Sequence, residues 1–262
     1  NATYGTHYQC VFIRGAIGSD VNLIITTGVG TEFDTNSSSG RLTNLTISNT
    51  SGQVSWEAGM SISGDLVVSA SGGNFRPYNM AYPLTVDGNV TVNGILVHSG
   101  DVPTGAFTFG SLTINSGGTF RATSGTTTIK GNASSSSNLA WANSGTFTHN
   151  SGTVLFDGTN TFGGSSYAHI NPATNTFNNL TINADSKYIQ LRENGTTLTV
   201  AGNLTLTDGT LVNYGTQTPV LTVTGDVSIA DGATIGGTDT SSAMNFGSLT
   251  IADGGTFIAT SG

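Results

Sequence analysis

The carboxylates of this 262-residue chain are the first candidates for chemistry, because paired Asp or Glu side chains cleave polysaccharides by acid–base catalysis. Many of the Asp residues, however, stand directly before a glycine. Asp-Gly pairs form turns, since Gly tolerates positive φ and Asp hydrogen-bonds to nearby backbone groups. We therefore interpret these carboxylates as turn residues and expect no catalytic pair. They are Asp87, Asp157, Asp208, Asp231 and Asp253.

The histidines and the single cysteine show no spacing typical of a metal site. The acidic repeats and loops that bind calcium are missing from the sequence, although an occasional ion at an acidic corner stays an alternative. Cys10 alternates with Tyr8 and Phe12, which favours a buried strand cysteine over an intermolecular disulfide. We expect no metal site and no cofactor. The histidines are His7, His98, His149 and His169.

An Asn or Asp recurs immediately before short strand-like segments, most of which have the form apolar-Thr-apolar. If successive segments stack, these side chains lie above one another and can hydrogen-bond to the next one or to corner backbone groups. The pattern predicts a polar ladder at a corner of the fold. Its members are Asn44, Asp65, Asn89, Asn179, Asn203 and Asp226.

Several of these residues also belong to Asn-x-Ser/Thr sequons, the acceptor sequence for N-glycosylation. For residues at strand starts we favour the structural role. Asn36, Asn132 and Asn194 lie in loop-like stretches instead and are the better candidate glycosylation sites, provided that the source organism N-glycosylates its proteins.

The stretches 70–82 and 131–141 depart most from the regular pattern. Exposed aromatic rings beside polar groups can hold a glycan, although such rings also cover the edge of a core. The candidate ligand-binding residues of the first stretch are Phe75, Arg76, Tyr78 and Tyr82.

The elements that position these residues come from internal repetition. The segment 109–125 returns at 246–262, where 14 of 17 positions are identical. A shorter unit recurs along each half of the chain, as in Leu-Thr-Val-Ala-Gly-Asn-Leu-Thr-Leu at 198–206. Repetition at a fixed interval predicts a repeat architecture, and here two tandem blocks of about 1–125 and 126–262.

The first apolar residue after each turn gives the length of the unit. These anchors recur at nearly equal intervals within each of two sets, and a gap of about three units separates the sets. We predict that the anchors are buried and stack along one interior face. They are Leu45, Leu66, Val90 and Leu112 in the first set and Leu180, Leu204, Val227 and Leu249 in the second.

Alternating apolar and polar residues over three to six positions predict short strands, and no segment has helical periodicity. A propeller blade needs about twice this unit length. The sequence therefore predicts an all-β fold, a parallel β-helix or β-solenoid with coils of about 22–24 residues. We expect it to be right-handed, as parallel crossovers almost always are.

Composition restricts the partners. Charged residues make up only 8% of the chain and the net charge is −8, which disfavours nucleic acid and anionic membranes. No apolar run in the sequence is long enough to span a bilayer, so we expect no membrane insertion. A surface rich in Ser, Thr, Asn and Gly and poor in Lys favours an extracellular or cell-surface location.

The segments 144–158, 176–182 and 198–206 resemble the β-helical repeat regions of large prokaryotic surface proteins, of the adhesin and filamentous-haemagglutinin-like kind. The resemblance covers about 42–262 and implies a secreted, non-catalytic stalk or fibre. The segment 1–41 matches poorly, and we expect it to form N-terminal coils or an assembly segment.

These observations favour a non-enzymatic extracellular structural protein, either a filament subunit or an adhesin stalk. The apolar, uncapped character of both ends predicts stacking end to end, on copies of the chain head to tail or on further repeats of the same chain. The alternatives are a module that binds glycans or surfaces and, less favoured, a polysaccharide-degrading β-helix enzyme.

Overall fold

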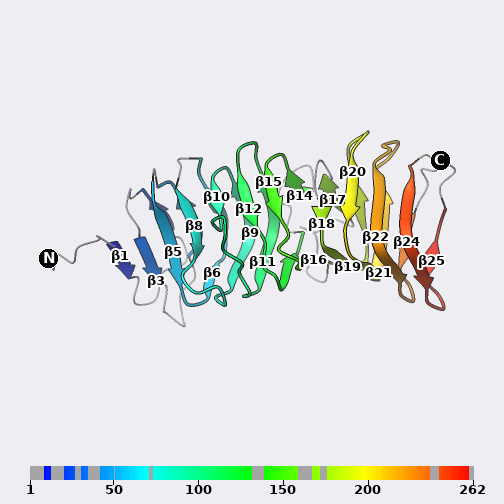
Figure 1. Cartoon of the computed structure of the whole chain (residues 1–262), viewed down its shortest axis with the longest axis horizontal. Helices are drawn as coiled ribbons and strands as arrows, with labels where there is room; N and C mark the ends of the chain where they lie inside the picture. Colours follow the sequence, from blue (N-terminus) through cyan, green and yellow to red (C-terminus); the bar gives the residue numbers. More distant parts are fainter. Residues whose placement is uncertain are drawn as a thin grey trace.

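The alternation of apolar and polar residues produces short parallel strands that stack into a rod. The computed structural model describes residues 9–12, 21–26, 31–34, 42–49, 51–70, 73–131, 139–158, 167–171, 176–236 and 242–259, and for 9–12 and 31–34 the backbone alone. Each strand pairs in parallel with a strand about one coil later, as Leu66 does with Val90. Coils follow one another along the rod, so that the first and last strands lie at opposite ends (Figure 1). The fold is the predicted parallel β-solenoid.

Each coil has three faces, which we number in chain order. Face I consists of β1 (Gln9–Phe12), β3 (Thr31–Asp34), β5 (Gln53–Glu57), β8 (Asn74–Pro77), β10 (Ile95–Leu96), β12 (Thr119–Arg121), β15 (Thr146–Thr148), β18 (Thr176–Phe177), β20 (Thr197–Val200) and the first parts of β22 (Val220–Ile229) and β24 (Met244–Ile251).

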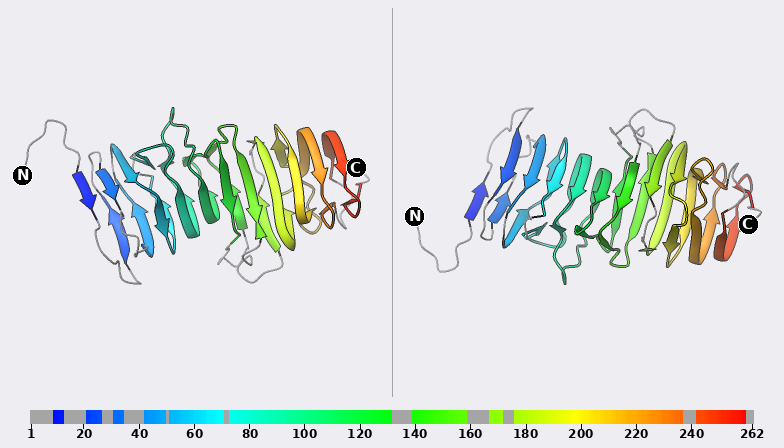
Figure 2. Two further views of the ribbon diagram at one scale, coloured as in Figure 1. Left: turned by 90° about the horizontal axis from the view of Figure 1, so that it is seen from below. Right: turned by 90° about the horizontal axis from the view of Figure 1, so that it is seen from above.

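Face II consists of β6 (Met60–Ile62), the first parts of β9 (Leu84–Val92) and β11 (Phe107–Ile114), β13 (Thr126–Ile129), β16 (Thr153–Asp157), the first parts of β19 (Asn179–Leu191) and β21 (Leu204–Asn213), and the second parts of β22 and β24. Face III consists of β2 (Asn22–Ile25), β4 (Asn44–Ile47), β7 (Leu66–Val68), the second parts of β9 and β11, β14 (Leu139–Asn143), β17 (Tyr167–Asn171), the second parts of β19 and β21, β23 (Thr234–Ile235) and β25 (Thr256–Phe257). Views from two further sides show the strands of successive coils side by side along the rod (Figure 2).

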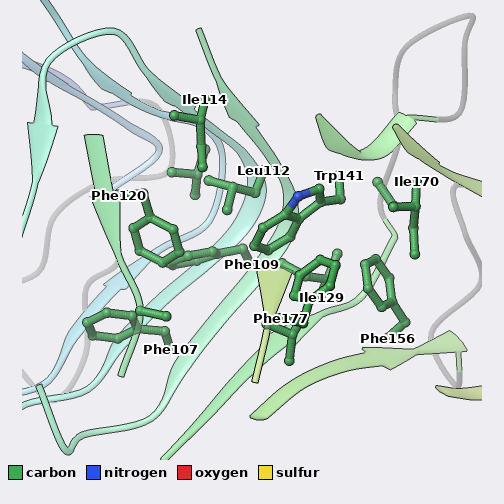
Figure 3. Close-up of a cluster of buried hydrophobic side chains, with 14 of the residues drawn as sticks. Phe107, Phe109, Leu112, Ile114, Phe120, Ile129, Trp141, Phe156, Ile170 and Phe177 are labelled. Atoms are coloured by element: carbon green, nitrogen blue, oxygen red, sulfur yellow. The ribbon is translucent and has the colours of Figure 1, made fainter. Parts of the chain in front are cut away.

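The interior of the coils is apolar and continuous. Successive side chains of a strand point to opposite sides, so every second residue faces inward. Along face III the stack of Leu45, Leu66, Val90 and Leu112 is fully buried. Aromatic rings fill the middle of the rod, where several are packed against one another (Figure 3).

The predicted single stack of anchors is wrong, because the two sets of anchors lie on different faces. Leu45, Leu66, Val90 and Leu112 stack on face III, whereas Leu180, Leu204, Val227 and Leu249 stack on face II. All of these side chains except Leu249 are buried as predicted. The exception is 38% exposed because it belongs to the last coil described.

The shift of face results from two long coils between the sets. Leu112 pairs back with Val90 at the usual interval, but onward with Trp141, and Trp141 pairs in turn with Ile170. Both of these intervals are longer than the earlier ones. Leu180 then follows Ile170 by less than half a coil, which is too short to reach face III again. It therefore lies on face II, whereas a third full turn of the chain would have brought it back to face III.

The ladder of hydrogen-bonded strands on face I is interrupted where these long coils lie. β15 ends the series that begins at β1, and β18 pairs onward with β20. Within the described residues, no strand pairing joins β15 to β18. Ring contacts span the gap instead, with centroids of Phe147 and Phe177 at 5.7 Å and Trp141 at 5.0 Å from each.

The N-terminal segment 1–41 contributes strands to the same ladders. β1 pairs with β3, β3 with β5 and β2 with β4. Cys10 lies in β1 opposite Glu32 of β3, but the predicted burial concerns a side chain outside the described part. None of the residues described belongs to a helix of the length and apolarity needed to cross a membrane.

Candidate functional site

The four residues predicted to bind a ligand differ in exposure, and one of them faces the core. Phe75 is fully buried and packs on Trp56 at 4.7 Å between ring centroids, so its ring is unavailable to a ligand. The alternation of β8 points Phe75 inward and Arg76 outward. Its aromatic type suggested a ligand contact, but the strand period decides which way it faces.

The other three members of that set have separate roles. The Arg76 guanidinium pairs with the Asp101 carboxylate at 2.7 Å and ties the 97–106 loop to face I. Tyr82 is half-buried against the core. Only Tyr78, 55% exposed, presents its ring to solvent.

The corner Asn and Asp residues form two hydrogen-bonded ladders. In the first, the Asp65 backbone N–H donates to Asn44 Oδ1 at 2.7 Å, and the Asn89 N–H donates to Asp65 Oδ1 at 2.7 Å. This ladder follows the corner between faces II and III and continues to the Ser111 hydroxyl.

The second ladder follows the corner between faces I and II. The Asn203 N–H donates to Asn179 Oδ1 at 2.9 Å, and the Asp226 N–H donates to Asn203 Oδ1 at 3.0 Å. The Ser248 hydroxyl donates to Asp226. Each side chain satisfies a backbone N–H of the next coil, where the chain turns out of the strand ladder.

For a steric reason, a glycine precedes each ladder residue whose backbone N–H donates to the preceding coil, namely Asp65, Asn89, Asn203 and Asp226. A Cβ on Gly202 would overlap Asn179 Oδ1, and a Cβ on Gly225 would overlap Asn203 Oδ1. Only a residue without a side chain leaves room for the carboxamide of the preceding coil. The recurrent Gly-Asn and Gly-Asp pairs are therefore part of the ladder.

Replacing Gly202 with Ala is expected to lower the free energy of unfolding by about 2–3 kcal/mol, because it forces the ladder apart and breaks its hydrogen bond. The matched control is Gly125→Ala. Its Cβ would meet only ordinary contacts, the nearest being Thr104 O at 3.4 Å, so its stability should change little. Urea unfolding followed by circular dichroism measures both, and equal losses would contradict the steric role.

Two of the three candidate glycosylation sites, Asn36 and Asn132, lie outside the described residues. Asn194 is exposed in a turn, and its Oδ1 accepts a hydrogen bond from the Thr218 N–H at 2.9 Å.

Among the residues described, no group of three or more His, Cys, Asp or Glu side chains could hold a metal ion.

A groove on the outside of face III was not predicted. It has a volume of about 390 Å³ and runs across β19, β21 and β23 towards the last coil. Tyr188 forms one wall, 47% exposed, and none of the described lining residues is charged. The groove is lined by Tyr188, Gln190, Thr210, Val212, Asn213, Gly215, Thr234, Gly236 and Ile258.

A buried histidine supports this groove from the side. Arg192 donates to His169 Nδ1 at 3.1 Å, and a guanidinium has no acceptor, so Nδ1 carries no proton. Nε2 then holds the proton and donates to Gln190 Oε1 at 2.8 Å. The Arg192 guanidinium also lies 4.6 Å from the centre of the Tyr214 ring. These contacts fix the orientation of the Gln190 side chain at the groove.

Comparison of this chain with protein-family models, curated proteins and solved structures found no match. The resemblance to adhesin and haemagglutinin-like repeats therefore stays a prediction.

The groove could not be predicted from local sequence patterns, because it depends on which outward positions of successive coils are aligned. Tyr167 and Tyr188 are register partners on neighbouring strands, and so are His169 and Gln190. The inward anchors repeat clearly because Leu, Val and Ile dominate them. The outward positions vary from coil to coil, and their alignment is visible only once the strand register is known.

Proposed function

We propose that the chain is a non-enzymatic extracellular structural protein, a β-solenoid rod that serves as a filament subunit or adhesin stalk. The stacked coils and their polar ladders support this proposal, since they repeat a three-faced coil along one axis. Asp231 and Asp253 lie in turns before a glycine of positive φ, as predicted, whereas Asp87, Asp157 and Asp208 lie within β9, β16 and β21. We propose a structural, non-catalytic role for all five. An extracellular or cell-surface location agrees with the acidic, lysine-poor composition.

The observation that carries the proposal is the uncovered interior of the last coil described. Leu249 is 38% exposed and Ile251 43% exposed, whereas their partners one coil earlier, Val227 and Ile229, are buried. Such a surface also presents strand backbone groups ready for pairing. Another coil of the same kind would bury these residues as Leu249 and Ile251 bury their own partners.

We propose that this coil comes from a second copy stacked head to tail, or from further repeats of the same chain. Contacts of this kind do not close on themselves and generate filaments. Parallel in-register strands provide both the apolar contact and the backbone hydrogen bonds.

Ile251→Asp is expected to abolish end-to-end assembly, because it places a charge in the stacking surface. The matched control is Val102→Asp in the 97–106 loop, since Val102 is 44% exposed but lies far from the end. Sedimentation velocity over a hundredfold concentration range should show elongated oligomers for the unchanged chain and for Val102→Asp, and a monomer for Ile251→Asp.

A chain that stays monomeric throughout that range would contradict stacking between copies. Cleavage of a polysaccharide by the purified chain, abolished by substitution of one carboxylate, would contradict the non-enzymatic assignment. Circular dichroism of both variants checks that the rod itself is intact.

A further inference from the structure

We propose that the groove on face III binds a neutral saccharide chain laid along the rod. This is a lateral binding site, and it is independent of how the rod assembles at its ends. The volume of about 390 Å³ lies in the range of ligand sites. The described lining carries no charge, so a charged ligand would lose its hydration there without a partner.

The side chains that line the groove combine the two kinds of contact that a sugar offers. A sugar ring has faces of C–H groups, which pack on aromatic rings, and hydroxyls around its rim, which hydrogen-bond. Tyr188 provides an exposed ring, and the Thr210 and Thr234 hydroxyls and the Gln190 carboxamide provide polar groups. Because the Gln190 oxygen is occupied by His169, its amide N–H groups remain as donors towards the groove.

The register of the strands arranges these groups along the axis of the rod. Tyr167, Tyr188, Thr210, Thr234 and Thr256 occupy the same position in successive coils. Neighbouring strands are about 4.8 Å apart, which is the length scale of one sugar ring. A polymer lying along the rod would therefore meet a ring or a hydroxyl at every step.

Two features favour a saccharide over a peptide. The strands of face III under the groove are paired on both sides, β19 with β17 and β21, and β21 with β23. They have no open edge at which an extended peptide could add as a strand. In addition, Tyr167, Tyr188 and Tyr214 are exposed by 39%, 47% and 36% on this one region of the surface.

The site is also organised before a ligand arrives. The His169 ring stacks on Tyr167 at 5.2 Å between centroids and meets Tyr214 edge-on at 4.8 Å. Together with the Arg192 contacts, this packing restricts side-chain rotation beside the groove. Restricted side chains lose less conformational entropy on binding.

The test measures binding of the full chain to soluble neutral hexasaccharides of glucose, xylose, mannose or N-acetylglucosamine by isothermal titration calorimetry. We expect at least one to bind, and Tyr188→Ala to weaken it about tenfold through loss of ring stacking. Tyr188→Phe keeps the ring and should stay within about threefold of the unchanged chain.

The matched control is Tyr78→Ala, which removes a similarly exposed tyrosine from another part of the rod and should leave binding unchanged. Thermal unfolding by circular dichroism checks that every variant is folded. Binding of none of the sugars, an unchanged affinity of Tyr188→Ala, or an equal loss in Tyr78→Ala would overturn the site. Binding restricted to an acidic oligomer such as hexagalacturonate would overturn the assignment to neutral saccharides.

Discussion

Replacing Leu204 with Asp is expected to lower the free energy of unfolding by more than about 5 kcal/mol. Leu204 is fully buried on face II, between Leu180 of the preceding coil and Val227 of the next. The substitution removes an apolar contact with both coils and leaves an unpaired carboxylate in a dry interior. Since domain stability is typically about 5–15 kcal/mol, much of the chain should unfold at room temperature.

The adjacent Thr205 provides the control, because it points outward from the same strand. Thr205→Asp introduces the same charge at the next position and should change stability by about 1 kcal/mol or less. Denaturant unfolding of both variants measures the difference. Similar losses at the two positions would contradict the alternation that defines the inside of the coil.

The elements and the interior positions of this fold could be predicted from the sequence, because they depend on local patterns. The alternation at 198–206 predicts that Leu204 and Leu206 face inward, as both do. The recurrence of Asn179 and Asn203 one coil apart indicates the corner hydrogen bond between them. Both inferences need only the strand period and the length of a single coil.

The face of the rod on which a given segment lies could not be predicted, because it depends on the summed lengths of all the coils before that segment. The segments 109–114 and 246–251 are identical in sequence, yet Phe109 lies on face II and Phe246 on face I. The same segment fits both places because each face requires the same inward apolar and outward polar pattern. The two long coils between them displace the second copy by one face.

The residues that line the groove could not be predicted from the sequence for a related reason. The sequence predicts that Phe75 binds a ligand because it is an aromatic residue in an irregular stretch. Phe75 belongs to β8, however, and its side chain lies in the core. Tyr188 and Gln190 occupy a long regular strand, where nothing in the local pattern marks them. Their significance comes from neighbours on other coils, such as Thr210 and Val212, which only the strand register brings beside them.

The strand ladder on face I is interrupted between β15 and β18, and we call this interface between neighbouring coils the joint of the rod. A solenoid is stabilised mainly by contacts between neighbouring coils, so one weak interface can divide it into two units. Between β15 and β18 the coils are joined on face I by the contact of the Phe147 and Phe177 rings, and Trp141 of face III packs against both rings. Faces II and III remain paired there, through β16 with β19 and β14 with β17.

Trp141→Ala is therefore expected to destabilise this joint by about 3–5 kcal/mol, because it leaves a large cavity among the rings. Trp141 is fully buried, and Figure 3 shows it between Ile170 and Phe109. With the joint weakened, the parts before and after it should unfold separately. Differential scanning calorimetry should then show two transitions in place of one.

Trp56→Ala is the control that separates this joint from the general cost of losing a buried tryptophan. Trp56 is equally buried and packs on Phe75, but it lies in β5, which is paired on both sides with β3 and β8. A loss of similar size is expected there, without division of the transition, because hydrogen bonds still join the coils on face I. If Trp141→Ala unfolds in one transition like Trp56→Ala, the aromatic cluster fills space without acting as the joint, and pairing on faces II and III is enough to keep the rod cooperative.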